Sequence, residues 1–202
     1  VYFLRPTFPG RRALLIALSG TTSKEVGAAV LAHLTAIVTA AEIPGFEWAL
    51  SALDDAQVIA HLEGLLANPE LTARREIYRL LFGRRTLDAS AILTRALSQE
   101  HDLEVLIDLL TRSVGRDDPT LIAAASTFID RGDQLTLAAL PVLEGVEDLT
   151  LAPRYAALAR RFPIGDTLHH RAYAMLIAMP KNAAVVELRN IAQDPIVEGA
   201  LR

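Results

Sequence analysis

The amino-acid sequence predicts an all-α fold, an α-solenoid of about five to six stacked antiparallel helical hairpins. Apolar residues recur at positions i, i+3, i+4 and i+7 in segment after segment, which is the period of an amphipathic helix. No segment shows the sustained apolar and polar alternation of a strand, and no Asn-Gly or Asp-Gly hairpin signal is present. The candidate helices also repeat with a period in the low thirties, as arrays of helical hairpins do.

The composition excludes several classes of protein. The 202 residues are 51% hydrophobic and 22% charged, with no cysteine and a formal net charge of −4. This apolar content excludes an intrinsically disordered chain, and the absence of cysteine excludes disulfides, thiolate zinc ligands and a cysteine nucleophile. The negative charge argues against a general nucleic-acid binder. The first residues lack a signal-peptide pattern, and a cytoplasmic location is expected.

Residues 1–54 are expected to form N-terminal helices that act as a cap or a preceding repeat. Their most apolar part, residues 26–41, is uncharged, about sixteen residues long and flanked by Glu25 and Glu42. Because a membrane-spanning helix needs roughly 20 apolar residues, a buried helix is predicted here. Thr22 and Glu25 fit a capping box at its start.

The rest of the chain carries five clear helical stripes. Each stripe is a set of aliphatic, aromatic or small residues at helical spacing. They are Val58, Ile59, Leu62, Leu65 and Leu66; Leu103, Leu106, Ile107, Leu110 and Val114; Leu121, Ile122, Ala125, Phe128 and Ile129; Leu135, Ala138, Ala139, Val142 and Leu143; and Leu168, Ala172, Met175, Leu176 and Met179.

Capping residues mark where these helices should begin and end. Side chains of Asp and Asn accept hydrogen bonds from the free amides of a first turn, and Pro presets its backbone. The expected starts are Asn68-Pro69, Asp88, Asp102, Asp118-Pro119, Asp133 and Asp194-Pro195. Glycine supplies the left-handed residue after a last turn. The expected stops are Gly83, Gly115, Gly132, Gly145 and Gly165.

The predicted helices come in pairs. First helices begin near Ala56, Ala89, Pro119, Leu151 and Ala183, at steps of 33, 30, 32 and 32 residues, and their partners begin near Pro69, Asp102, Asp133, Thr167 and Pro195. Residues 55–202 are therefore expected to form helical repeats continuous with residues 1–54 as one structural unit. The last hairpin looks truncated, which predicts that the chain is part of a larger protein.

Residues 68–81, Asn-Pro-Glu-Leu-Thr-Ala-Arg-Arg-Glu-Ile-Tyr-Arg-Leu-Leu, resemble the turn and second helix of a HEAT repeat. Residues 118–125 and 194–201 are similar in their Asp-Pro turn, but they lack the arginine, and Pro119 opens a first helix whereas Pro69 and Pro195 open second helices. The resemblance to the HEAT and armadillo-like superfamily implies a scaffold that binds a partner peptide or protein on its concave face.

Motifs for catalysis or metal binding are sparse. The five histidines, His33, His61, His101, His169 and His170, include no pair four residues apart, and neither His-Glu-x-x-His nor Gly-x-Ser-x-Gly occurs. The acidic pairs Asp54-Asp55 and Asp117-Asp118 fall at helix starts, where capping is expected. We therefore predict no catalytic residue, no cofactor and no metal ligand.

Arginines gather in one segment as the candidate partner-binding residues: Arg74, Arg75, Arg79, Arg84 and Arg85. Their guanidinium groups could bind phosphate or an acidic segment, and the alternative interpretation is a solvated helix face with Glu63 and Glu70 nearby. The leading hypothesis is a non-catalytic interaction module for a peptide or protein. Two alternatives stay open, a binder of nucleic-acid phosphates through these arginines and a lyase-type enzyme on a helical-repeat scaffold.

Overall fold

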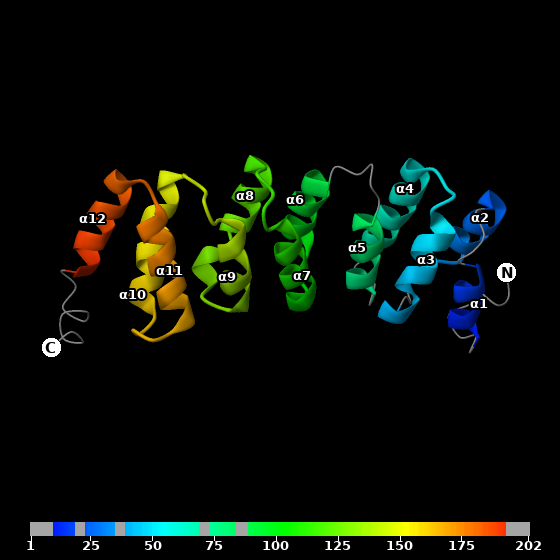
Figure 1. Ribbon diagram of the computed structural model, residues 1–202, viewed down its shortest axis with the longest axis horizontal. Coiled ribbons are helices and arrows are strands. Elements are labelled where there is room, and N and C mark those ends of the chain that lie inside the picture. The colour runs from blue at the N-terminus through cyan, green and yellow to red at the C-terminus, as the bar shows by residue number, and fades with distance from the viewer. Residues whose placement is uncertain (1–9, 19–22, 35–38, 69–72, 84–88, 193–202) are drawn as a thin grey trace. The chain divides into compact units, whose positions relative to one another are not determined.

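The described part of the chain is all-α, as predicted. The structure, a computed structural model, describes residues 10–18, 23–34, 39–68, 73–83 and 89–192. Every regular element in these ranges is an α-helix or a short 3-10 helix (Figure 1). The chain divides into two compact units, Val1–Ala89 and Ser90–Arg202. The predicted division after residue 54 stays a prediction.

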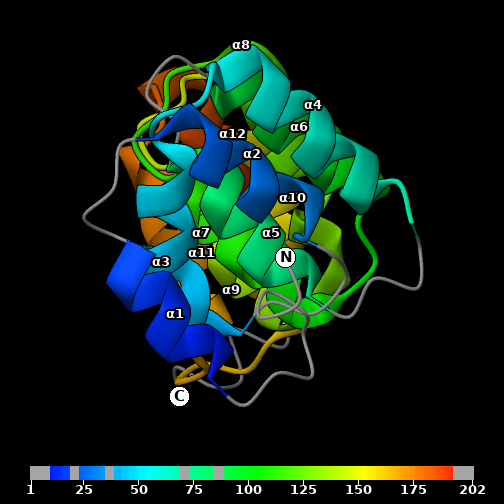
Figure 2. The same cartoon turned by 90° about the vertical axis from the view of Figure 1, so that its right-hand side faces the viewer.

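The helices of the first unit pack around α3. In chain order they are α1 (Arg11–Leu18), α2 (Lys24–Ala32), η2 (Ala40–Glu42), α3 (Ile43–Leu50), α4 (Asp55–Leu66) and α5 (Arg74–Phe82). Helix α3 contacts α1, α2 and α5, and α4 packs on α5 (Figure 2). The core includes Phe46, Leu50, Leu62, Ile77 and Leu81, all nearly inaccessible to solvent. The apolar faces of these short helices therefore meet in one core.

The predicted helix over residues 26–41 is wrong in its length. Helix α2 ends at Ala32 with His33 as its cap, and a separate 3-10 helix begins after Thr39. The amide and hydroxyl of Thr39 both donate to the carboxylate of Glu42, at 3.0 and 3.1 Å. Glu42 thus stabilises the start of a new helix, which is one reason why residues 26–41 do not form a single helix.

Helix α2 also starts one residue later than predicted. Its N-cap is Ser23, whose hydroxyl oxygen accepts from the amide of Val26 at 3.4 Å and donates to Glu25 at 2.6 Å. Thr22, the predicted cap, lies outside the described residues. The adjacent Ser23 supplies the same kind of hydroxyl oxygen. The helix is therefore capped by the chemistry expected, one residue after the position expected.

The second unit is also built from α-helices and short 3-10 helices. It contains α6 (Ala89–Gln99), α7 (Leu103–Ser113), α8 (Pro119–Ser126), η3 (Ile129–Arg131), α9 (Gln134–Ala139), η4 (Leu140–Val142), η5 (Leu149–Leu151), α10 (Ala152–Arg161), α11 (Thr167–Ala178) and α12 (Lys181–Ala192). Helix α10 packs along α11 and α12, and α7 packs on α9. Leu109, Leu121, Leu143, Ala156 and Leu176 are fully buried between them.

Aspartate caps fix many of the helix starts. Six aspartates accept hydrogen bonds from first-turn amides in the described chain: Asp54, Asp102, Asp118, Asp133, Asp148 and Asp166. The predicted starts at Asp102, Asp118 and Asp133 are confirmed. The predicted start at Pro69 and the cap at Asp194 lie outside the described residues, and α5 begins at Arg74.

Glycines close several of the helices. Gly115, Gly132, Gly145 and Gly165 have φ between +69° and +105°, the left-handed conformation predicted for them. Gly83 also follows a helix, but its φ is −68°, so the prediction of a left-handed residue there is wrong. Gly115 and Gly145 turn the chain in the loops that lead to α8 and η5, where they line the hollows described below.

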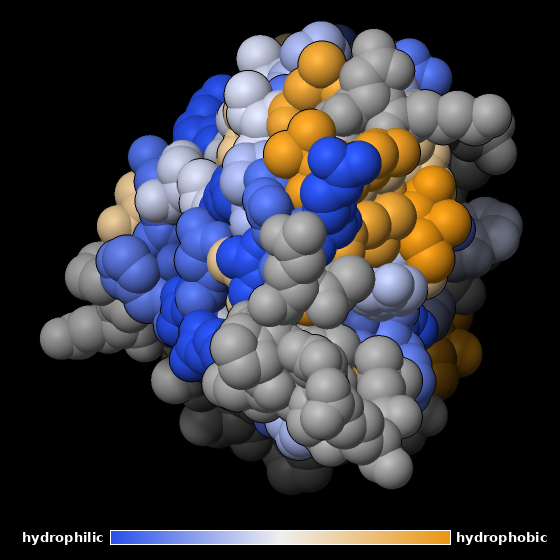
Figure 3. Space-filling view, turned by 90° about the vertical axis from the view of Figure 1, so that its left-hand side faces the viewer, coloured by the Kyte–Doolittle hydropathy of each residue, from blue (hydrophilic) through white to orange (hydrophobic). Residues whose placement is uncertain are grey.

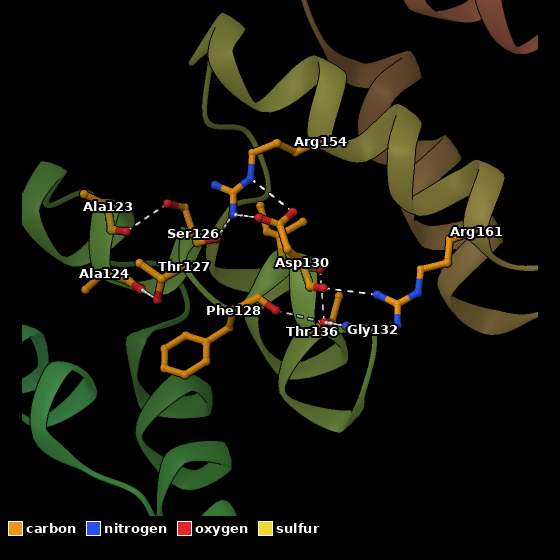
Figure 4. Close-up of polar contacts among 11 residues, drawn as sticks. Ala123, Ala124, Ser126, Thr127, Phe128, Asp130, Gly132, Thr136, Arg154 and Arg161 are labelled. Carbon is orange, nitrogen blue, oxygen red and sulfur yellow. Dashed lines mark hydrogen bonds and ion pairs between the residues drawn. The ribbon is translucent and has the colours of Figure 1, made fainter.

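Polar contacts tie α10 to the segment before α9. Arg154 donates to the carbonyl of Ser126 at 2.6 Å and to the carboxylate of Asp130 at 2.7 Å (Figure 4). The buried hydroxyl of Thr136 donates to the carbonyl of Phe128 at 2.8 Å and accepts from the amide of Gly132 at 2.8 Å. These bonds satisfy backbone groups at the irregular chain reversal and hold it in register with α10.

Candidate functional site

The arginine cluster is only partly described, and one of its members has a clear structural role. Arg74 donates from one nitrogen to the carbonyls of Leu66 and Asn68, at 2.9 and 3.1 Å, and so satisfies the end of α4. Arg75 and Arg79 are half-buried on α5. Arg84 and Arg85 lie outside the described residues, so a joint binding surface of all five arginines stays a prediction.

Three of the described histidines contact the backbone through a ring nitrogen. Nδ1 of His169 lies 2.8 Å from the carbonyl oxygen of Ala159, and Nδ1 of His33 lies 2.9 Å from that of Ala29. Nε2 of His61 lies 3.4 Å from the carbonyl of Leu34. Within the described ranges, no group of three or more His, Asp or Glu side chains is placed to hold a metal ion.

The two acidic pairs contain helix caps, as predicted. Asp54 accepts from the amide of Ala56 at 2.8 Å, and Asp118 accepts from the amide and the hydroxyl of Thr120 at 2.9 and 2.6 Å. The hydroxyl of Thr120, followed by the amide of Leu121, lowers the pKa of the Asp118 carboxyl. The neighbouring Asp117 is exposed and lines a surface hollow.

Three hollows on the surface of the second unit share parts of their lining. They lie where loops lead from α7 to α8, from η4 to η5 and from α11 to α12, along one edge of this unit (Figure 1). We call them the acidic hollow, of about 450 Å³, the tyrosine hollow, of about 160 Å³, and the arginine hollow, of about 300 Å³. Residues of segment 144–147 contribute to all three, so the hollows adjoin one another, and we call the three together the groove.

The hollows differ in their lining. The acidic hollow is lined by Gly115, Arg116, Asp117, Ile122, Val142, Glu144, Gly145, Val146 and Glu147. The tyrosine hollow is lined by Leu143, Gly145, Val146, Glu147, Tyr155, Met175, Ala178, Met179 and Pro180. The arginine hollow is lined by Leu140, Pro141, Glu144, Arg171, Ala174 and Met175. Apolar walls with a few charged groups at the rim are typical of sites that bind small ligands or peptide side chains.

Tyr155 is the unusual polar group of this groove. Its side chain is 1% exposed, and its hydroxyl has no hydrogen-bond partner among the described residues. Burial, reduced by Arg154 and reinforced by the carboxylate of Asp148, raises the pKa of Tyr155 to about 12. A buried hydroxyl without a hydrogen bond lowers the free energy of unfolding, so the folded protein would gain stability from an atom that bonds to Tyr155.

The sequence pattern missed this site. The stripe containing Met175 and Met179 predicts both residues as core positions of α11, and Met179 is indeed buried. Both line the tyrosine hollow, and they are the two methionines of the chain. The available signal was that both flexible, polarisable side chains fall one helical turn apart in a chain otherwise rich in Leu and Ala.

A second surface of interest lies on the last two helices. Ile177 of α11 and Val185 and Val186 of α12 are each more than half exposed. Figure 3 views this end of the second unit and shows apolar surface gathered there beside hydrophilic groups. Such surface is typical of contact regions, but it lacks the converging polar groups of the groove.

Within the described ranges, no helix combines the length and the apolar character needed to cross a membrane. No family model matches this sequence, and neither a curated protein nor a solved structure is significantly similar to it.

Proposed function

We propose that the chain is a protein-interaction module built from stacked helical hairpins, an α-solenoid of the HEAT-like kind, which binds an extended segment of a partner protein. The caps of the second unit support the repeat. Second-helix caps fall at Asp102, Asp133 and Asp166, in steps of 31 and 33 residues, and the first-helix caps Asp118 and Asp148 are 30 apart. Such hairpins bury their apolar faces against neighbours and leave a long surface for a ligand.

The observation that supports the binding function is the groove of three adjoining hollows. Residues from η4, from α11 and from three loops converge on it, so the scaffold holds its walls before any ligand arrives. A preformed groove reduces the entropy that binding costs. Its combination of apolar walls and exposed charges suits a peptide, whose side chains can occupy successive hollows.

Selection of peptides from a random phage-displayed library on the immobilised chain tests this function. We expect selected peptides to bind in fluorescence polarisation and to lose about tenfold or more of their affinity to the Glu144→Lys variant, because Glu144 lies between two of the hollows. Glu47→Lys is the matched control, since Glu47 is an exposed glutamate on α3 in the first unit.

Two outcomes count against the proposal. One is a library that yields no peptide with saturable binding. The other is a set of peptides whose affinity falls equally with Glu144→Lys and Glu47→Lys, because such peptides would respond to net charge and not to the groove.

A further inference from the structure

Tyr155, which lines the tyrosine hollow, carries a buried hydroxyl that lacks a hydrogen-bond partner within the described ranges. Roughly 90% or more of buried polar groups in proteins are hydrogen-bonded, whereas the hydroxyl of Tyr155 is buried and has no partner among the described residues. Leu143, Met175 and Met179, which line the hollow together with Tyr155, have apolar side chains and offer no strong acceptor. A bound group with a polar oxygen would supply the missing bond.

Tyr155 shares the lining of the tyrosine hollow with segment 145–147. Burial is the largest cause that raises the pKa of Tyr155, while the charge of Arg154 lowers this pKa and the charge of Asp148 raises it. Gly145, Val146 and Glu147 precede Asp148 directly and line the hollow together with Tyr155. A group bound in the hollow would therefore contact Tyr155.

The volume of the hollow restricts the group that can enter. Apolar protein cavities of about 150 Å³ hold one benzene-sized ring, and the tyrosine hollow measures about 160 Å³. An aliphatic group would fill the hollow and leave the hydroxyl unpaired. A single aromatic ring with one hydroxyl matches both the volume and the polar group, and in a peptide that ring is tyrosine.

The adjoining acidic hollow indicates which residues flank that tyrosine. Asp117, Glu144 and Glu147 are exposed at its rim, against one cation, Arg116, whose Nε donates to the carbonyl of Arg112. Three negative charges against one positive charge favour a ligand with lysine or arginine at this point. The shared segment 145–147 places the two hollows side by side.

We propose that the tyrosine hollow is an anchor pocket for a tyrosine side chain flanked by basic residues in a partner peptide, with a hydrogen bond between the two phenol groups. This inference rests on the proposed peptide-binding function and names the chemistry of its ligand. The flexible side chains of Met175 and Met179 adjust around the incoming ring, as methionines do at binding surfaces.

The test uses the methyl groups of the two methionines, labelled with carbon-13, as reporters in NMR titrations of the whole chain. Met175→Leu and Met179→Leu variants assign the two signals. The probes are three capped tripeptides, Lys-Tyr-Lys, Lys-Phe-Lys and Glu-Tyr-Glu, each titrated into the wild-type chain and into Tyr155→Phe. The two lysine peptides differ by one hydroxyl, and the two tyrosine peptides differ in charge.

We expect Lys-Tyr-Lys to shift both methyl signals and to bind about 2- to 10-fold more tightly than Lys-Phe-Lys, the value of one net hydrogen bond. Tyr155→Phe should bind the two lysine peptides equally, and Glu-Tyr-Glu should bind most weakly. Methyl signals that stay unchanged with all three probes overturn the anchor pocket. Equal binding of the two lysine peptides to the wild type overturns the hydroxyl contact, and equal binding of the two tyrosine peptides overturns the role of charge.

Failure here is distinguishable from failure of the general function. Library peptides that bind and respond to Glu144→Lys, while leaving both methyl signals unchanged, would retain the peptide-binding function and place its anchor elsewhere in the groove. A library without binders, together with silent methyl signals, would remove both proposals.

Discussion

Removing the hydroxyl of Tyr155 should stabilise the protein, although replacing a buried tyrosine by phenylalanine commonly destabilises one. Leaving a buried polar group without a hydrogen bond costs about 1–3 kcal/mol, and Tyr155→Phe removes that cost. The oxygen also makes a few dispersion contacts, whose loss takes back roughly 0.5–1 kcal/mol. The expected net change is a gain of about 1 kcal/mol in the free energy of unfolding, or about 3 °C in Tm.

Urea unfolding followed by circular dichroism measures this change. Tyr173→Phe is the control, because Tyr173 is exposed on α11 and its substitution should alter stability by less than about 0.5 kcal/mol. A loss of about 1 kcal/mol in Tyr155→Phe would refute the reasoning, since it would show that the hydroxyl makes a favourable hydrogen bond in the free protein.

The stability of the wild type and that of Tyr155→Phe should depend differently on pH in alkaline solution. The pKa of Tyr155 is raised from 10.0 in the unfolded chain to about 12 in the folded one, so its neutral form favours folding below pH 10 and this advantage is lost as the pH rises to about 12. Wild type should lose about 2 kcal/mol more than Tyr155→Phe over this interval, after allowance for solvent screening. Parallel stability curves across this range would contradict the burial of the hydroxyl.

Three further predictions concern the scaffold and are checked by unfolding measurements. Thr136→Val should cost about 1–3 kcal/mol, because it removes the hydroxyl that bonds buried backbone groups, whereas Thr111→Val at an exposed position should cost less. Glu42→Ala should cost about 3 kcal/mol because it removes the carboxylate that lies 3.3 Å from the buried guanidinium of Arg11; a cost under about 1 kcal/mol would show that this ion pair is not needed. Asp118→Asn should be less stable than the wild type above about pH 4, and the difference should shrink as the pH falls through the lowered pKa of Asp118, whereas a constant difference would exclude that carboxylate as the cause.

The sequence predicts the fold well where the determinants are local. An aspartate such as Asp102 or Asp133 bonds amides two or three residues away, so the residue type and the following apolar stripe are enough to place a helix start. The prediction fails where two neighbouring signals compete. The uncharged run after Glu25 has helical composition throughout, but the contact between Thr39 and Glu42 begins a new helix inside it.

The candidate site is harder to predict because its parts are far apart in the chain. The groove combines loops near residues 116 and 145 with residues of α11, and no spacing in the sequence indicates that these segments meet. The unpaired hydroxyl of Tyr155 is harder still, since it is defined by the lack of a partner in three dimensions. The sequence predicts the arginines of segment 74–85 as partner-binding residues, whereas Arg74 donates a hydrogen bond to the carbonyl oxygen of Leu66 at the end of α4.

Both sulfur atoms that an oxidant could modify in this sequence belong to residues that line one hollow. With no cysteine in the sequence, Met175 and Met179 are its two sulfur atoms, and both line the tyrosine hollow. Peroxide converts methionine to a polar sulfoxide, which brings a strong acceptor oxygen into an otherwise apolar wall. Mild oxidation of this protein therefore acts as a chemical modification of its proposed anchor pocket, and reduction of the sulfoxides restores the original surface.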